Sequence, residues 1–147
     1  MDFRTQIANQ VFGVRAVALI VQDGKIFLTK RGDSYHTIGG AVEVNESTNQ
    51  AVVRETKEEL GMDVEVIELA FVVENWFKVG EKKFHNIEFH YMVKPLEKTP
   101  NMMVEADYHF PCEWVSIDDL EHLDVRPDFL QREMKSWNGQ LKHIINY

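Results

Sequence analysis

The chain has 147 residues, enough to bury a hydrophobic core, and its 44% hydrophobic and 27% charged residues are typical of a soluble globular protein. No apolar run approaches the roughly 20 residues that span a bilayer, so we expect no membrane association. The net charge of −8 argues against a surface for nucleic acid polymers. It does not exclude a small phosphorylated substrate, because a bound cation can invert the local charge.

The sequence contains no repeat, low-complexity segment or linker, so we expect one domain over residues 1–147. Its one cysteine, Cys112, cannot form an internal disulfide, and its N-terminal residues do not resemble a secretory signal. Both observations are consistent with a reducing compartment, and we therefore expect a cytoplasmic protein.

The first third of the chain predicts a small group of strands. A long apolar run rich in β-branched residues is followed by the hairpin signal Asp23-Gly24, which predicts that the next segment pairs back. Arg31 to Ser34 is predicted to be a polar turn, and Gly39-Gly40 is expected to break the strand that follows. The predicted strands are Val11 to Val21, Lys25 to Lys30 and His36 to Val44.

A helix is predicted from Thr48 to Leu60. Ser47 has the position of an N-cap, and Gln50 lies three residues later as its capping-box partner. Gly61 follows the last apolar position and predicts the C-terminal end of the helix.

The rest of the chain alternates strands and short helical segments. Ser116 to Asp119 is expected to start a short helix, and Pro127 to about Ile145 is predicted as a C-terminal helix. Strands around one central helix indicate an α/β (α+β) fold with a mixed sheet and helices on both faces. The remaining predicted segments are strands Val64 to Glu74, Lys83 to Val93 and Phe110 to Val115, a Gly80 loop, and a loop from Pro95 to Asp107.

Three glutamates share one face of the central helix. Glu55, Glu58 and Glu59 are spaced i, i+3, i+4, which places them within an arc of roughly 100°. Like charges at these spacings destabilise a helix by about 0.2–0.5 kcal/mol per pair, and the negative C-terminal end of the dipole adds to the cost. A solvated charged face is the simpler interpretation. A bound Mg²⁺ or Mn²⁺ would remove the conflict, since both ions prefer oxygen ligands.

The residues that flank this helix fit a site as well as a simple turn. Gly39-Gly40 lies just before the helix, where glycine permits a close approach of the backbone to a phosphate or a metal. Glu46 lies at the helix entrance, eight residues before Arg54, and an ion pair between them would tie the loop to the helix.

The segment GAVEVNESTNQAVVRETKEELGM, Gly40 to Met62, resembles the signature of the Nudix (MutT-like) hydrolases, G-x5-E-x7-R-E-U-x-E-E-x-G-U, where U is bulky and apolar. All fixed positions are filled, and Met62 suits the final apolar position. Thr56 departs from the pattern, since an aliphatic residue is usual there. The fixed positions are Gly40, Glu46, Arg54, Glu55, Glu58, Glu59 and Gly61.

The resemblance implies an α/β/α sandwich in which the signature forms a loop-helix-loop. It also implies Mg²⁺-dependent hydrolysis of a diphosphate bond in a nucleoside diphosphate linked to a further group. Glu58 and Glu59 match the main metal ligands, with Glu55 as a third ligand or as the general base, and the Gly40 carbonyl often joins them. Arg54 and Glu46 would hold these ligands in place.

Several further site residues are predicted with an alternative beside each. Glu105, in the loop after Pro100, is a candidate base or metal ligand, and otherwise a solvated acid; Glu88 is a weaker candidate. Arg31 is a candidate phosphate ligand near Gly39 and Gly40, and otherwise a surface charge. Trp76 is a candidate for stacking on a base, although aromatic residues in strands usually pack in the core.

A catalytically silent module that senses nucleotides is the alternative to an active hydrolase, although such modules usually lack signature glutamates that this chain keeps. A non-enzymatic scaffold is a third possibility. A small nucleotide derivative is the expected partner, and a homodimer is plausible for the family. The sequence names no substrate: Glu74-Asn75-Trp76-Phe77 lacks the proline associated with ADP-ribose hydrolases.

Overall fold

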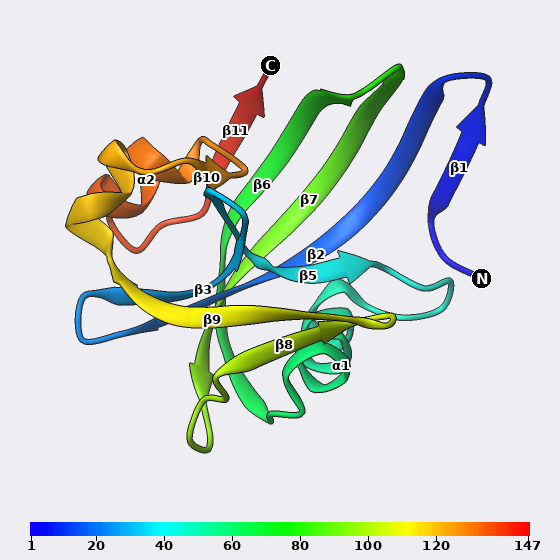
Figure 1. Ribbon diagram of the computed structural model, residues 1–147. Coiled ribbons are helices and arrows are strands. Elements are labelled where there is room, and N and C mark those ends of the chain that lie inside the picture. Colours follow the sequence, from blue (N-terminus) through cyan, green and yellow to red (C-terminus); the bar gives the residue numbers. More distant parts are fainter.

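We analysed a computed structural model that describes all residues from Met1 to Tyr147. Figure 1 shows a large curved sheet with few helices. The elements are β1 Arg4–Ile7, β2 Gln10–Gln22, β3 Lys25–Arg31, β4 Ser34–His36, β5 Ile38–Ala41, α1 Thr48–Leu60, β6 Val64–Val79, β7 Lys82–Pro95, β8 Met102–Glu105, β9 Tyr108–Ser116, η1 Ile117–His122, β10 Val125–Arg126, α2 Leu130–Ser136 and β11 Lys142–Asn146.

The sheet is mixed, with the strand order β10-β4-β3-β2-β7-β6-β11. The centre is the long β2, which pairs in parallel with β7 and antiparallel with β1, β3 and β5. β6 and β7 form a long antiparallel hairpin, and β11 joins β6 in parallel. β8 and β9 form a second hairpin that pairs with β3.

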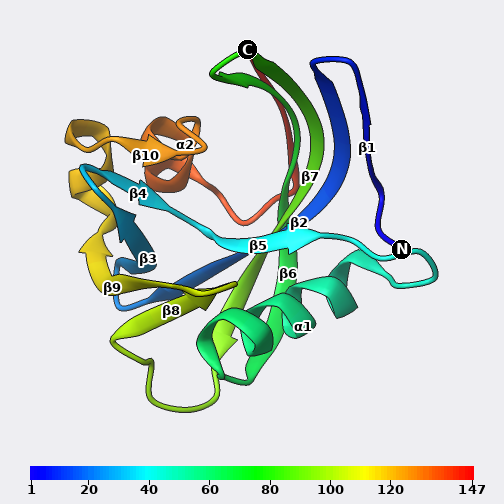
Figure 2. The same ribbon diagram turned by 45° about the vertical axis from the view of Figure 1, so that its right-hand side comes forward.

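Alternate residues of β2 divide the hydrophobic core into two layers. Val17 and Leu19 pack toward η1, α2 and β11, whereas Ala16, Ala18 and Ile20 pack toward α1. This period of two follows from the pleat of a strand whose two faces are both covered. Figure 2 shows α1 apart from α2 on the other side of the sheet. The predicted mixed sheet between helical layers is therefore confirmed.

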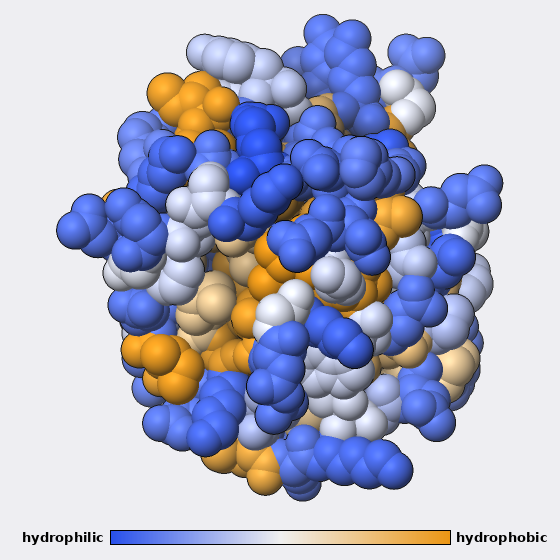
Figure 3. Space-filling model, turned by 90° about the vertical axis from the view of Figure 1, so that its left-hand side faces the viewer, coloured by the Kyte–Doolittle hydropathy of each residue, from blue (hydrophilic) through white to orange (hydrophobic).

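One core layer lies on the side of α2 and η1. Figure 3, seen from the side of α2 and η1, shows apolar atoms between predominantly hydrophilic side chains. Phe129 and Leu130 are fully buried there, and the rings of Phe71 and Phe129 pack edge to face with their centroids 5.3 Å apart.

No helix of the protein combines the length and the apolar character that crossing a membrane requires.

The local helix signals are confirmed. α1 occupies Thr48–Leu60, the predicted range, and Ser47 and Gln50 exchange both hydrogen bonds of a capping box. Gly61 ends the helix in the left-handed conformation with φ of 65°, and its N–H bonds to the Lys57 carbonyl. Thr56, the departure from the signature, is fully buried and donates its hydroxyl hydrogen to the Val52 carbonyl at 2.7 Å. Its extra polar group is therefore satisfied within the helix.

The predicted C-terminal helix from Pro127 to Ile145 is wrong. α2 covers only Leu130–Ser136, and the chain then turns at Gly139 with φ of 86° and continues as β11. Apolar residues at helical spacing produced the error, because Leu130, Met134, Trp137, Leu141 and Ile144 recur every three or four residues. Lys142 to Asn146 are extended because they pair with the distant strand β6, and this pairing outweighs the local helical spacing.

Two smaller expectations also need correction. The expected loop from Pro95 to Asp107 contains β8, whose Met103 is buried under α1, and only Ala106-Asp107 form the turn to β9. The predicted polar turn from Arg31 to Ser34 is confined to Gly32-Asp33. β8 pairs with the adjacent strand β9, and β4 pairs with the adjacent strand β3 and with β10. Both segments are too short to show the apolar alternation from which strands are predicted.

The strand assignment of β11 can be tested with adjacent residues. Ile144 is 6% exposed and belongs to the core, whereas Ile145 is 50% exposed. Replacing Ile144 with Ala should lower the free energy of unfolding by about 2–5 kcal/mol because it removes buried methyl groups. The Ile145→Ala control should cost only about 0.5 kcal/mol. Equal losses in urea titrations of the two variants would contradict the alternation.

Candidate active site

The glycine pair lies where the backbone must approach other groups closely. Gly39 and Gly40 pair with Val17 and Ala16 across the β2–β5 ladder. A Cβ atom on Gly39 would lie 2.4 Å from the Ala16 carbonyl oxygen, and one on Gly40 would lie 2.4 Å from the Glu55 carboxyl carbon. The absence of a side chain at Gly40 therefore leaves room for the Glu55 carboxylate. The helix face can then pack directly against the strand.

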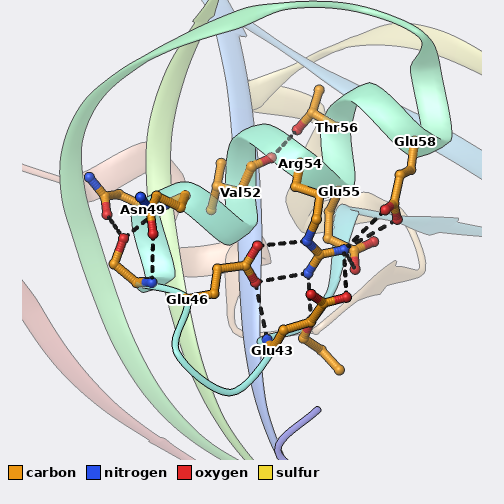
Figure 4. A network of polar contacts seen from close by, with 11 residues as sticks. Glu43, Glu46, Asn49, Val52, Arg54, Glu55, Thr56 and Glu58 are labelled. Atoms are coloured by element: carbon orange, nitrogen blue, oxygen red, sulfur yellow. Dashed lines mark hydrogen bonds and ion pairs between the residues drawn. The ribbon is translucent and has the colours of Figure 1, made fainter. Parts of the chain in front are cut away.

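Arg54 is the hub of the site (Figure 4). Its Nε and Nη2 atoms donate to the two carboxylate oxygens of Glu46 at 2.7 and 3.0 Å, and Nη2 also donates to the Ala41 carbonyl at 3.1 Å. Nη1 lies 2.9 Å from Glu55 Oε1 and 3.2 Å from Glu58 Oε2. The predicted ion pair between Glu46 and Arg54 is present, and it ties the loop before α1 to the helix.

Glu46 is held as an anion within this network. Its hydrogen bonds from Arg54 lower the pKa of the Glu46 carboxyl, which burial alone would raise. Glu46 Oε1 also accepts from the backbone N–H of Glu43 at 3.0 Å. The same carboxylate therefore binds the loop backbone and the guanidinium, which fixes the path of the chain into α1.

The three helix glutamates differ in environment. Glu58 is the most exposed and extends toward Arg54, whereas the Glu55 side chain is 14% exposed and lies above Gly40. Burial raises the pKa of Glu55, and the Arg54 hydrogen bond opposes it. Glu59 is 9% exposed, and burial, followed by repulsion from Glu55 and Glu105, raises the pKa of Glu59 to about 8.

One carboxyl oxygen of Glu59 lacks a hydrogen-bond partner. Its Oε2 atom is buried and accepts no hydrogen bond. A buried acceptor without a partner costs about 1–3 kcal/mol, which a donor or a cation would remove. No group of three acidic, His or Cys side chains is drawn together closely enough here to form a metal cage, since Arg54 holds Glu55 and Glu58. The all-oxygen set nevertheless suits a hard divalent cation.

Glu105 and Arg31 reach the same cavity from the other side. Glu105 ends β8, and its carboxylate forms an ion pair with Arg31. The Arg31 guanidinium also lies 4.5 Å from the centre of the Phe110 ring. The β8–β9 hairpin thus brings Glu105 within electrostatic reach of Glu59. Glu105 and Arg31 remain candidates for the roles predicted from the sequence.

Trp76 lies in a different setting from the one expected. Its indole stacks on His85 at a centroid distance of 4.3 Å and on Tyr147 at 5.0 Å. These rings come from β7 and the end of β11, on opposite sides of β6. Both faces of the indole are therefore covered, and a base could stack on Trp76 only by displacing one of them.

One cavity of about 1330 Å³ joins the glutamates of α1 to a second group of polar residues. Most of this second group was missed from the sequence, and it lies on the inner face of β6, β7 and β11 and before α2. The cavity-lining members are Asn75, Asn86, Glu88, Asp128 and Asn146. The available signal was the alternation of Asn86, Glu88 and His90 with apolar residues, which marks one polar strand face.

Glu88, the weaker candidate base, is engaged elsewhere. Its carboxylate oxygens bind His90 at 2.9 Å and Asn75 at 3.1 Å, and Glu88 is 4% exposed. Arg15 lies next to it on β2 and acts electrostatically on Glu55, Glu59 and Glu88. Arg15 therefore stands between the acidic helix face and the polar strands.

Comparisons with known proteins agree with this geometry. A CTP pyrophosphohydrolase of Escherichia coli K12 is 37% identical over 116 residues, which cover 75% of this chain and 80% of that protein. The crystal structure of a MutT Nudix hydrolase from Burkholderia pseudomallei is 30% identical, with a TM-score of 0.61, over 73% of this chain and 84% of that one.

A second solved structure, the mutator MutT protein from Bacillus halodurans, has a TM-score of 0.70 at 18% identity, over 91% of this chain and 89% of that one. This likeness concerns the fold. The NUDIX domain family matches residues 12–137, which include every element from β2 to α2 apart from the first two residues of β2. With all fixed positions of the signature filled and a matching fold, the chain belongs to the Nudix family of hydrolases.

Proposed function

We propose that this protein hydrolyses a diphosphate bond in a nucleoside diphosphate derivative, with Mg²⁺ or Mn²⁺ bound by Glu55, Glu58, Glu59 and the Gly40 carbonyl. The observation that carries this proposal is the Glu59 carboxylate, which is buried beside Glu55 and leaves one oxygen without a partner. Nudix hydrolases generally use divalent metals, and the oxygen-only set here fits such an ion.

A divalent cation at this face would neutralise charge on the phosphoryl oxygens and lower the pKa of a bound water. The residues of the chain provide the geometry. Arg54 orients Glu55 and Glu58 from one side, and its bidentate pair with Glu46 fixes its own position. Arg31 and Arg15 supply positive charge for substrate phosphates, and Arg31 would exchange its partner Glu105 for a phosphate oxygen.

Two residues are proposed as alternatives for the general base. Glu105 faces the cavity from the β8–β9 hairpin and is free to accept a proton once Arg31 binds phosphate. Glu55 is closer to the other helix carboxylates, but Arg54 holds one of its oxygens. Proton transfer by either would contribute about 10²–10⁴-fold to the rate.

The similarity to a CTP pyrophosphohydrolase makes nucleoside triphosphates the first substrates to test. The expected products are a nucleoside monophosphate and pyrophosphate. The cytoplasmic location and the homodimer expected from the sequence remain part of this proposal.

The metal ligands can be tested by charge removal. Glu58→Gln and Glu59→Gln should each reduce Mg²⁺-stimulated turnover by at least about 10²-fold, because each loses a carboxylate ligand worth several kcal/mol in the transition state. Glu65→Gln, at an exposed position of β6, is the matched control and should keep wild-type turnover. Phosphate release from nucleoside triphosphates, with pyrophosphatase as coupling enzyme, measures the rate.

A wild-type protein that binds nucleotides but never turns them over would favour the sensing module instead. If turnover survives both glutamine substitutions, Glu58 and Glu59 are not the metal ligands on which the reaction depends. Circular dichroism of each variant establishes whether α1 is retained.

The raised pKa of Glu59 predicts how stability depends on pH without metal. The folded protein binds this proton more tightly than the unfolded chain, so stability falls as pH rises from about 4.5 to about 8. Glu59→Gln has no such proton to lose. The free energy of unfolding of wild type, relative to that of Glu59→Gln, should therefore fall by on the order of 3 kcal/mol between pH 5 and pH 8. Urea unfolding in chelator at both pH values measures this difference. If the two proteins differ in unfolding free energy by the same amount at pH 5 and at pH 8, the burial of Glu59 is contradicted.

A further inference from the structure

β1 is a free edge of the sheet, with no element beyond it in Figures 1 and 2. It pairs with β2 on one side, and no strand pairs with its other side. All four residues of β1, Arg4–Ile7, are exposed. Proteins usually block an edge strand with lysine, proline or a bulge, because its unpaired N–H and C=O groups can bind another chain. β1 has none of these, and its pairing with β2 is regular.

The backbone polar groups of β1 alternate in direction. The Phe3 carbonyl accepts a hydrogen bond from the Val14 N–H at 2.8 Å, so the backbone of Phe3 faces β2. In an antiparallel ladder, every second residue faces the partner strand and the residues between them face away. The N–H and C=O groups of Arg4 and Gln6 therefore point outward from the sheet, where they have no partner strand.

The side chains along β1 alternate as well. Phe3, Thr5 and Ile7 lie on the face of the sheet away from the active-site cavity, beside Phe12 of β2, which is opposite Thr5. Phe3 is 47% exposed, Ile7 68% and Phe12 39%. Arg4 lies on the other face and lines the cavity. Large apolar side chains gathered along a free edge indicate a surface that binds another protein chain.

The other edges of the sheet are protected. β10 is only two residues long. β11 carries Lys142 and His143, and Lys142 forms an ion pair with Glu133. β1 has one charged side chain, Arg4, and the neighbouring Asp2 pairs with it at 3.4 Å. No net charge along this edge therefore repels a second copy of the chain.

We propose that β1 binds β1 of a second copy in antiparallel orientation, about a twofold axis that passes beside Thr5. The sheets of the two copies then become one. In this register Arg4 lies opposite the partner's Gln6, so their outward N–H and C=O groups exchange hydrogen bonds, and the symmetry repeats the exchange. Phe3 lies opposite the partner's Ile7, so both apolar side chains gain a cross-strand neighbour on the same face.

The neighbouring registers fit less well. The outward residues must lie opposite one another to form ladder hydrogen bonds, so the axis must pass beside a single residue. An axis at Arg4 would set two arginines directly opposite each other, which destabilises a strand pair. An axis at Gln6 would bring Arg4 opposite Ala8, a turn residue with φ of 54°. An axis at Phe3 would engage only Arg4 and Thr5 of the β1 residues.

This interface is small and lies next to the cavity. It uses Phe3 to Ile7 of each copy, far fewer than the roughly 20–30 residues per side of a standard interface, so we expect a dissociation constant on the order of 10–100 µM. Because Arg4 lines the cavity, the partner's Gln6 would add an amide at its rim. The inference rests on the homodimer within the proposed function and does not depend on hydrolysis.

Sedimentation velocity over a range of protein concentrations tests the dimer. Ile7→Lys should raise its dissociation constant at least about tenfold, because it sets an ammonium group against the partner's Phe3. Gln6→Pro should have a similar effect, since it removes an outward N–H that the single copy does not use. Val79→Lys, at a 59% exposed position of β6, is the matched control and should leave the constant unchanged. Circular dichroism should match wild type for all three variants.

Cysteine cross-linking tests the register in a Cys112→Ala background. Directly opposite residues that share no hydrogen bonds have Cα atoms about 4.5 Å apart, within reach of a disulfide. Thr5→Cys should therefore form a covalent dimer under mild oxidation. Gln6→Cys is the control, because two copies of Gln6 would be diagonal neighbours about 7–8 Å apart and should not cross-link.

The inference is overturned by a wild-type protein that stays monomeric at about 1 mM, roughly tenfold above the weakest expected constant. It is also overturned by a dimer that persists unchanged in Ile7→Lys and Gln6→Pro, or by Gln6→Cys cross-linking as fast as Thr5→Cys. None of these readouts uses turnover. A monomer that hydrolyses nucleotides would leave the proposed reaction intact and overturn this inference, and a Thr5-linked dimer without hydrolysis would do the reverse.

Discussion

The bidentate pair between Arg54 and Glu46 is the interaction on which the geometry of the site depends. Arg54 is on the second turn of α1 and Glu46 is in the preceding loop, so their two hydrogen bonds fix the loop relative to the helix. The remaining donors of Arg54 reach Ala41 at the end of β5 and two of the three helix carboxylates. Lysine could not replace it, because one ammonium cannot make this planar set of contacts.

This hub explains how one helix face can hold three glutamates. Arg54 reduces the mutual repulsion for Glu55 and Glu58, while burial and repulsion from Glu55 and Glu105 raise the pKa of Glu59 to about 8. One buried oxygen of Glu59 is left without a hydrogen-bond partner. A divalent cation would give it one, so the feature that destabilises the free protein is the one that suits the proposed site. Arg15 separates this acidic end of the cavity from the polar side chains of β6, β7 and β11.

The sequence predicted best what local interactions determine. The limits of α1 follow from Ser47, Gln50 and Gly61, which act within a few residues, and the signature spacing located Glu46, Arg54 and the three glutamates. It predicted least well what depends on distant pairing. β11 has helical apolar spacing but adds to β6, about 70 residues earlier in the chain. Asn146 and Asn75 become neighbours only through that pairing, so the hydrogen bond between them could not be predicted from the sequence. Trp76 was a reasonable candidate for stacking until His85 and Tyr147 were found against its two faces.

The most direct test of the central claim is a product assay over a panel of nucleoside triphosphates and nucleoside diphosphate derivatives, with Mg²⁺ and with chelator. Phosphorus NMR distinguishes the bond that is cut. We predict cleavage within the diphosphate linkage of at least one compound, yielding a nucleoside monophosphate, only when the cation is present. Binding of nucleotides without cleavage across the panel, or cleavage that is unchanged by chelator, would contradict the account.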